Sequence, residues 1–153
     1  MDVDEDRRGS VDEMEQEILS RPGFLMDGAH HTREYTTISM AVFTLLRVLH
    51  GYETGEPLYQ DLLRNNALFF VPVVNRDAHA LISETFEKEG KFPMIRKNRH
   101  NYGDTETDTD KCSIGVDLNR NYGFEFAHDD VGSKVDPCND NYRGPEPFSE
   151  PET

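Results

Sequence analysis

The sequence predicts an α/β fold, with helices lying on the faces of a sheet. Three observations lead to this prediction. Strand-like apolar runs alternate with segments of helical periodicity, residues 67–75 form a continuous apolar run, and Gly, Pro and Asn separate the segments. Strands that alternate with helices form sheets that helices cover. A continuously apolar strand is typical of one that is buried on both faces.

The first strand is expected at residues 24–27 and ends at a glycine turn. Apolar residues then recur at i, i+3, i+4, i+7, i+8 and i+11 from residue 38 to residue 49, which marks one face of a helix. Thr36 and Thr37 are suitable caps at the start of this helix, and Gly51 is expected to stop it.

A second, shorter helix opens at Pro57, which suits the first helical position. It is expected to turn three leucines inward: Leu58, Leu62 and Leu63. The apolar run at 67–75 is the second strand, and residues 77–88 form a third helix. After residue 90, Gly, Asn, Asp and Pro dominate, and only residues 116–118 are strand-like.

The charge of the chain excludes several classes of partner. Its 153 residues include 30 Asp and Glu against 16 Lys and Arg, which gives a formal net charge of −14. Binding to nucleic acid needs a basic surface that neutralises phosphates, and docking on anionic lipid needs basic residues too. No apolar run approaches the roughly 20 residues of a membrane helix. We therefore expect no nucleic-acid partner and no membrane association.

The acidic residues are concentrated at the start of the chain. Residues 1–20 hold eight acids and two arginines, with no basic start followed by an apolar stretch. This segment is expected to be a solvated, disordered arm without a visible signal peptide. Residues 21–153 are expected to form the folded part.

Residues 27–35 (DGAHHTREY) carry the clearest chemistry in the sequence. After the glycine turn, His31 and Glu34 stand three residues apart where a helix begins. Residues at i and i+3 share a helical face, so an imidazole nitrogen and a carboxylate oxygen can converge on one zinc ion. Two alternatives remain open at this point. The pair can be a capping or surface pair, and His30 is a rival ligand four residues before Glu34.

This segment resembles the HxxE zinc signature of the M14 metallocarboxypeptidases, the carboxypeptidase A/B family. Four further blocks resemble that family in its own order: FVPVVNRD at 70–77, IRKNR at 95–99, CSIGVDLNRNY at 112–122 and CNDNYRGPEPFSEPET at 138–153. The resemblance implies part of a mixed, twisted sheet with helices on both faces. The family's later blocks have no match, so residues 21–153 are expected to be a partial catalytic domain whose C-terminal half is absent.

The resemblance implies one zinc ion held by three protein ligands. His31 and Glu34 correspond to two of them, and the third, a later histidine of the family, has no counterpart in this chain. The His₂Glu ligand set of carboxypeptidase A is itself a standard example of a catalytic zinc site. Cys112 and Cys138 resemble the family's structural disulfide.

Four further residues take substrate-binding and catalytic roles by resemblance. Arg99 resembles the arginine that polarises the scissile carbonyl and stabilises its oxyanion, a task that suits a permanent cation with a rigid donor fork. Arg33 resembles an arginine of the substrate-binding wall. Asn119 and Arg120 resemble the pair that binds the terminal carboxylate of the substrate.

The sequence therefore predicts a zinc-dependent metallocarboxypeptidase that acts on the C-termini of peptides or proteins and is inactive as this 153-residue chain. One alternative is a non-catalytic carboxypeptidase-like binding module, and another is a related zinc amidohydrolase. The resemblance and the cysteine pair imply a secreted, extracellular or lysosomal-type location. The residues present do not distinguish an apolar from a basic side-chain preference.

Overall fold

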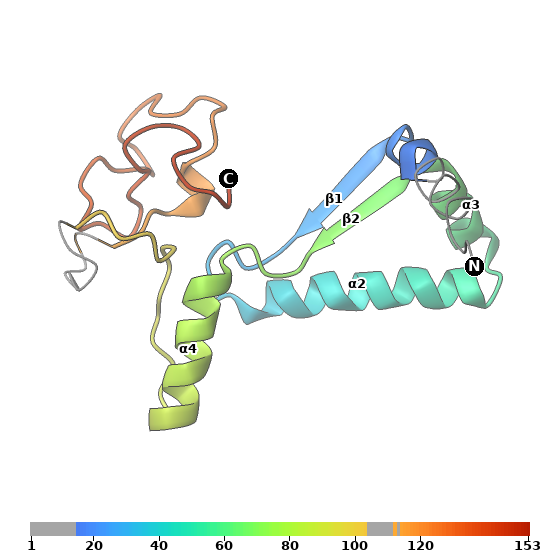
Figure 1. Cartoon of the computed structure of the whole chain (residues 1–153), viewed down its shortest axis with the longest axis horizontal. Coiled ribbons are helices and arrows are strands. Elements are labelled where there is room, and N and C mark those ends of the chain that lie inside the picture. Colours follow the sequence, from blue (N-terminus) through green and yellow to red (C-terminus); the bar gives the residue numbers. More distant parts are fainter. Residues whose placement is uncertain (1–14, 104–111, 113) are drawn as a thin grey trace, which may run out of the picture. The chain divides into compact units, whose positions relative to one another are not determined.

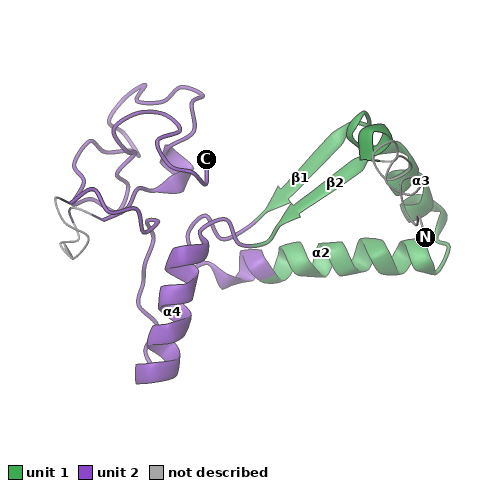
Figure 2. Ribbon diagram, viewed as in Figure 1, with its two compact units in different colours: residues 1–27, 39–72 green, residues 28–38, 73–153 purple. Residues whose placement is uncertain are grey.

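The computed structural model describes residues 15–103, 112 and 114–153, and the chain divides into two compact units (Figures 1 and 2). Unit 1 comprises Met1–Asp27 and Ser39–Pro72, and unit 2 comprises Gly28–Ile38 and Val73–Thr153. The elements are β1 (Gly23–Asp27), α2 (Tyr35–Glu53), α3 (Pro57–Asn65), β2 (Ala67–Val71), α4 (Arg76–Glu89) and the 3₁₀ turn η1 (Leu118–Arg120). The order of strands and helices confirms the predicted α/β class.

Unit 1 contains the sheet, which has two parallel strands in the described part of the chain. Gly23 of β1 pairs with Ala67 of β2, and the register continues to Asp27 and Val71. Parallel neighbours need a long crossover connection, and α2 and α3 provide it (Figure 1). The carboxyl end of β1 leads directly into the loop that carries the predicted metal ligands.

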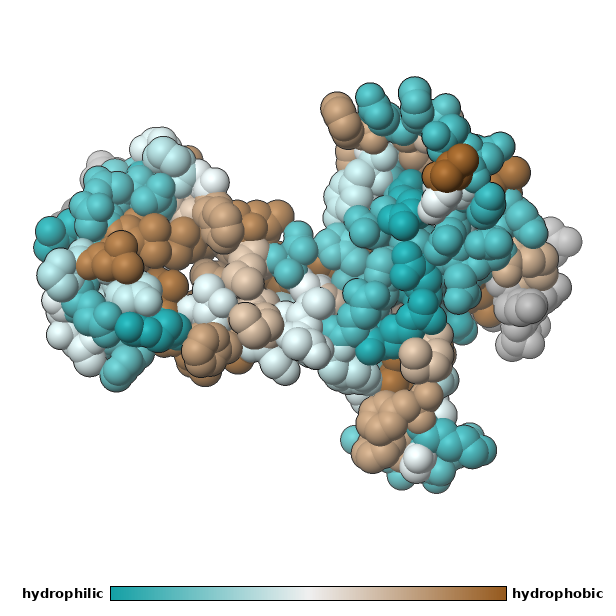
Figure 3. Space-filling view, turned by 180° about the vertical axis from the view of Figure 1, so that it is seen from behind, coloured by the Kyte–Doolittle hydropathy of each residue, from teal (hydrophilic) through white to brown (hydrophobic). Residues whose placement is uncertain are grey.

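The second strand is shorter and less buried than the sequence predicts. It ends at Val71 rather than at residue 75, and the side chains of Phe69 and Val71 remain 43% exposed. The reason is that each described strand has one neighbour only, so the sheet does not enclose its apolar residues as a larger parallel sheet would. The inward orientation predicted for Leu58 is also wrong, because this residue is 71% exposed. Figure 3 shows apolar surface over unit 1 in agreement with these values.

Helix α2 continues past the residue that was expected to stop it. Gly51 lies inside the helix and is buried. A Cβ atom at this position would collide with the ring of Tyr59 on α3. Arg47 of α2 stacks over the same ring at 4.5 Å and forms a two-pronged ion pair with Glu56 at 2.8 and 3.0 Å. Gly51 therefore permits α3 to pack closely on α2 and does not end the helix.

The strand predicted at 116–118 is wrong, although these residues are fully buried. Their backbone amides donate to separate partners rather than to successive residues of one neighbouring strand. The Val116 amide donates to Asn98 Oδ1 at 2.8 Å, and the Asp117 amide donates to the Tyr142 carbonyl at 2.8 Å. The chain then turns into η1, where the Asp117 side chain accepts from the Asn119 amide.

Unit 2 is organised around buried polar side chains. Asn121 is fully buried and donates through Nδ2 to the carbonyls of Arg143 and Glu146 at 2.8 and 3.0 Å. Its Oδ1 accepts from the Glu150 amide at 3.2 Å. Glu150, 2% exposed, accepts in turn from Asn98 Nδ2 at 2.6 Å. These bonds connect the blocks 95–99, 112–122 and 138–153 into one network.

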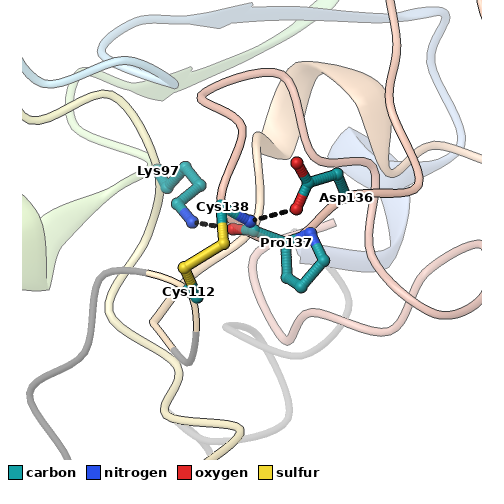
Figure 4. The surroundings of a disulfide bond; sticks show 5 residues. All are labelled: Lys97, Cys112, Asp136, Pro137 and Cys138. Atoms are coloured by element: carbon teal, nitrogen blue, oxygen red, sulfur yellow. Dashed lines mark hydrogen bonds between the residues drawn. A yellow bond between two sulfur atoms is a disulfide. The ribbon is translucent and has the colours of Figure 1, made fainter.

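The disulfide implied by the resemblance is confirmed. Cys112 is bonded to Cys138, 26 positions later (Figure 4). Close to this bond, Lys97 Nζ donates to the Pro137 carbonyl at 2.8 Å, and the Cys138 amide donates to Asp136 Oδ1 at 2.9 Å. The disulfide holds the segment around residue 138 against residue 112, and the Lys97 bond holds it against the segment that follows α4.

The acidic segment 1–20 lies mostly outside the described residues, and its described end, 15–19, is helical. Within the described part of the chain, no helix is both long and apolar enough to cross a membrane.

We expect the stability of unit 2 to fall at acid pH partly through Glu150. Burial raises the pKa of this carboxyl, but hydrogen bonds from Tyr102, Asn98 and Ser149 outweigh burial, and the pKa lies below its ordinary value. A carboxyl with a lowered folded-state pKa contributes stability above its unfolded value of about 4.3, and this contribution is lost as the pH falls through the folded value. Glu150→Gln should therefore show a flatter decline in unfolding free energy below about pH 4.

The matched control is Glu146→Gln, because Glu146 is an exposed carboxylate of the same segment. Urea unfolding between pH 2.5 and 7 measures the effect. If the unfolding free energy falls with the same slope at acid pH in the wild type and in Glu150→Gln, the prediction is contradicted.

Candidate functional site

The loop between β1 and α2 holds the two predicted metal ligands in a rigid turn. The Glu34 amide donates to the His31 carbonyl at 3.0 Å. Thr37 Oγ1 donates to the Glu34 carbonyl at 2.7 Å and accepts from the Ala29 amide at 2.9 Å. Ala29 is buried and has a left-handed backbone (φ 54°), a conformation that usually favours glycine. Thr37 thus connects the helix start to both ends of the loop.

His31 lies between two carboxylates. Its Nδ1 is 3.1 Å from Glu34 Oε1, and its Nε2 is 2.8 Å from Asp117 Oδ1. The ring is buried, Asp117 is fully buried, and Glu34 is more exposed. The two residues that the spacing placed on one helical turn are therefore neighbours in the structure, although the turn precedes α2 rather than belonging to it.

Asp117 is also paired with Arg96. The guanidinium contacts Asp117 Oδ2 through Nε at 2.9 Å and Nη2 at 2.8 Å. Burial raises the pKa of Asp117, but hydrogen bonds from His31 and Arg96 and the charge of Arg96 outweigh burial, so the pKa lies below its ordinary value. Asp117 is consequently a carboxylate at neutral pH.

The charge state of Asp117 determines which nitrogen of His31 carries a proton. A carboxylate only accepts hydrogen bonds, so Nε2–H donates to Asp117 and a neutral ring presents the Nδ1 lone pair to Glu34. The Nδ1 lone pair then faces Glu34 Oε1 at 3.1 Å and accepts a hydrogen bond from Arg96 Nη1 at 3.3 Å. Such an arrangement suits a cation, and imidazole nitrogen with carboxylate oxygen is a donor set that zinc accepts. A carboxylate behind the ring is the usual support of a zinc-binding histidine.

The two neighbouring histidines have different partners. His30 Nε2 lies 2.7 Å from the Tyr122 hydroxyl, while His31 faces Glu34. The geometry therefore favours His31 over His30 as the ligand that accompanies Glu34. Among the described residues there is no group of three or more His, Cys, Asp or Glu side chains arranged to hold a metal ion.

Arg99 belongs to the segment that follows α4, and Arg33, from the loop before α2, is bonded to the same segment. Arg33 Nη1 donates to the Met94 carbonyl at 3.2 Å and lies 3.8 Å from Asp140 Oδ2. Arg99 is exposed, and together with Asp140 it lines a hollow of about 220 Å³. Asp140 therefore connects the surroundings of the two arginines.

Asn119 and Arg120 line a second, larger hollow of about 490 Å³, which Tyr122 also lines. Two donors of Arg120 are used internally: Nε bonds the Gly132 carbonyl and Nη1 bonds the Asn119 carbonyl, both at 2.7 Å. These bonds orient the guanidinium and hold η1 against the loop around residue 132. Arg120 and Arg99 line separate hollows in unit 2.

Sequence reasoning missed Asp117 and Arg96 as parts of the site. The available signal for Asp117 was an acid inside the apolar run 114–118 (IGVDL), a position where a charge needs a partner. Arg96 stands in the IRKNR block, where only Arg99 was assigned a role, and its side chain is mostly buried.

Comparison with known proteins gives a consistent result. The family model described as zinc carboxypeptidase matches residues 6–153. Carboxypeptidase B of Astacus astacus is 33% identical over 132 residues, which make up 86% of this chain and 38% of that protein. An inactive metallocarboxypeptidase of Ajellomyces capsulatus is 30% identical over 129 residues, or 84% of this chain and 19% of that protein.

Solved structures agree with the sequence relatives. The crystal structure of thrombin activatable fibrinolysis inhibitor is similar with a TM-score of 0.65 and 28% identity, over 87% of this chain and 30% of that chain. The chain thus spans between 19% and 38% of the length of these three proteins.

Removal of the Arg96 guanidinium should strongly destabilise unit 2. In Arg96→Met the buried Asp117 carboxylate keeps His31 but loses its cationic partner. Breaking a buried ion pair by removing one partner costs about 3 kcal/mol or more. Chemical unfolding of the wild type and the variant measures this loss.

Arg47→Met is the matched control, because the Arg47–Glu56 pair has similarly short distances but is exposed. Exposed pairs are screened by solvent and contribute little, so the loss should be much smaller. Equal losses in the two variants would contradict a buried, paired role for Arg96.

Proposed function

Because this chain belongs to the zinc carboxypeptidase family, we propose that it provides metal-binding and substrate-binding residues of a zinc-dependent metallocarboxypeptidase. The reaction is hydrolysis of the last peptide bond of a peptide or protein substrate. The observation that carries the proposal is the convergence of His31 Nδ1 and Glu34 Oε1 at 3.1 Å, with the ring supported by a buried carboxylate. The family match over residues 6–153 supports the same conclusion.

In this proposal His31 and Glu34 hold one zinc ion. When bound, the ion supplies Lewis-acid chemistry toward a carbonyl group and a water molecule. Asp117 keeps the proton on His31 Nε2, so that Nδ1 carries a lone pair, and the ion would replace Arg96 Nη1 as the partner of that lone pair. Arg96 keeps Asp117 ionised, because two of its N–H groups contact Oδ2.

The arginines act on the substrate. The exposed guanidinium of Arg99 donates hydrogen bonds to the scissile carbonyl oxygen, where negative charge develops during attack by water. Asn119 and Arg120 bind the terminal carboxylate, and the bonds of Arg120 to the carbonyls of Asn119 and Gly132 fix its orientation beforehand. Arg33 forms part of the wall that the substrate contacts.

A second candidate function is binding of a peptide C-terminus without hydrolysis. The observation in its favour is that one relative, 30% identical, is an inactive metallocarboxypeptidase. In that case Asn119 and Arg120 would still bind a carboxylate, and this binding would be insensitive to a metal chelator.

The proposed location is an oxidising compartment outside the cytosol. The disulfide between Cys112 and Cys138 supports this, because structural disulfides form and persist in secreted and extracellular proteins.

Zinc titration of the oxidised 153-residue chain tests the metal site. The wild type should bind zinc weakly, because two ligands are present, and His31→Ala and Glu34→Ala should each weaken binding at least about tenfold. His79→Ala is a control, because this histidine lies on α4 with its ring 5.7 Å from that of Tyr35 and tilted by 56° to it. Equal zinc affinity in the wild type, His31→Ala and Glu34→Ala would refute the metal site.

The 153-residue chain should show no carboxypeptidase activity, because it offers two of the three expected ligands and no matched general base. Mass spectrometry of short peptides incubated with the purified chain measures removal of C-terminal residues. Removal that a chelator abolishes would contradict this prediction.

A further inference from the structure

The backbone that leads into His31 is held by a residue outside the HxxE segment. Three consecutive carbonyls, those of Gly28, Ala29 and His30, accept hydrogen bonds from Val74 and Asn75. The Val74 amide donates to Gly28 at 2.9 Å, and the Asn75 amide donates to Ala29 at 3.1 Å. The third bond comes from a side chain: Asn75 Nδ2 donates to the His30 carbonyl at 3.0 Å.

Asn75 occupies the N-cap position of α4 without capping the helix. An asparagine at this position usually accepts a hydrogen bond from an amide of the first helical turn, yet its side chain makes no such bond here. The amide group is directed to the loop before His31. The contact with His30 therefore replaces the ordinary local role of this residue.

The burial of Asn75 shows that this arrangement has a cost. The residue is fully buried, and its Oδ1 is the one buried side-chain acceptor without a hydrogen-bond partner in the described part of the chain. Buried polar atoms are normally paired. The side chain leaves its oxygen unpaired while its NH₂ group bonds the His30 carbonyl. Its role is therefore not limited to filling space in the core.

The side chain of His30 is held as well. Its ring is hydrogen-bonded to the Tyr122 hydroxyl at 2.7 Å. His30 is therefore fixed at its carbonyl by Asn75 and at its ring by Tyr122, and the next residue in the chain is His31. Rotation of the His30–His31 peptide would move the His30 carbonyl away from Asn75 Nδ2 and break this hydrogen bond.

We propose that Asn75 is a positioning residue of the metal centre, which fixes the His30–His31 peptide and so directs His31 toward Glu34. The inference rests on the proposed function of His31 and Glu34 as zinc ligands. The side-chain hydrogen bond of Asn75 goes to the His30 carbonyl, so it acts through the backbone. Residues behind a metal ligand typically change metal affinity by 10- to 100-fold when they are replaced.

The test is a zinc titration of the oxidised full chain, with thermal unfolding measured in parallel. Asn75→Ala should bind zinc about tenfold more weakly than the wild type. Asn66→Ala is the matched control, because Asn66 Nδ2 also donates to a backbone carbonyl at 3.0 Å, that of Leu62, at the end of α3. The control should show a similar change in melting temperature and unchanged zinc affinity.

A double-mutant cycle separates positioning from a general loss of structure. If Asn75 acts through His31, the variant with both His31→Ala and Asn75→Ala should bind zinc no more weakly than His31→Ala alone. Tyr122→Phe provides a second, independent variant should Asn75→Ala not fold. It removes only the hydroxyl that holds His30, and it should lower zinc affinity several-fold.

The outcomes distinguish a failure of the role of Asn75 from a failure of the zinc site itself. Zinc binding by the wild type that depends on His31 but is unaffected by Asn75→Ala, or by Tyr122→Phe should Asn75→Ala not fold, would overturn this inference and leave the proposed function intact. Additive losses in the double-mutant cycle would overturn it too. Zinc binding that does not depend on His31 would overturn the proposed function and the inference together.

Discussion

The ionised carboxylate of Asp117 is the point on which the candidate site depends. It accepts hydrogen bonds from the ring of His31, the guanidinium of Arg96 and the amide of Asn119. These three partners come from the loop before α2, the segment after α4 and η1. A buried carboxylate is stable only when it is paired and hydrogen-bonded, so the charge itself requires the three segments to meet. The orientation of His31, the proposed metal ligand, and the placement of Asn119, which is proposed to bind substrate, therefore have a common origin.

The two units differ in how they are stabilised. Unit 1 depends on apolar packing, yet Phe24 and Leu25 of β1 are each 58% exposed, and Phe43 of α2 is 62% exposed. Unit 2 instead uses the buried polar network of Asn98, Asn121 and Glu150 together with a disulfide. Polar networks specify one geometry, because each donor must find its acceptor at a fixed distance. That is an appropriate foundation for a site whose chemistry depends on the direction of individual atoms.

The sequence predicted the elements that local patterns determine and missed what long-range polar contacts determine. Apolar periodicity located both strands and the helices, and the resemblance identified the disulfide. Residues 116–118 were wrongly predicted as a strand, because their amides are satisfied by Asn98 and Tyr142, which no local pattern reveals. The partner of His31 was missed for the same reason, since Asp117 lies 86 positions away. The spacing of His31 and Glu34 was visible because a single turn brings them together.

The conformation of Ala29 illustrates why tertiary bonds, rather than local preference, shape this loop. A left-handed backbone costs an alanine on the order of 1–2 kcal/mol. Here the Ala29 amide donates to Thr37 Oγ1 and its carbonyl accepts from the Asn75 amide. Two hydrogen bonds of about 1 kcal/mol each are enough to offset this strain. The same contacts that hold Ala29 in an unfavourable conformation therefore bring His31, two residues later, to Glu34.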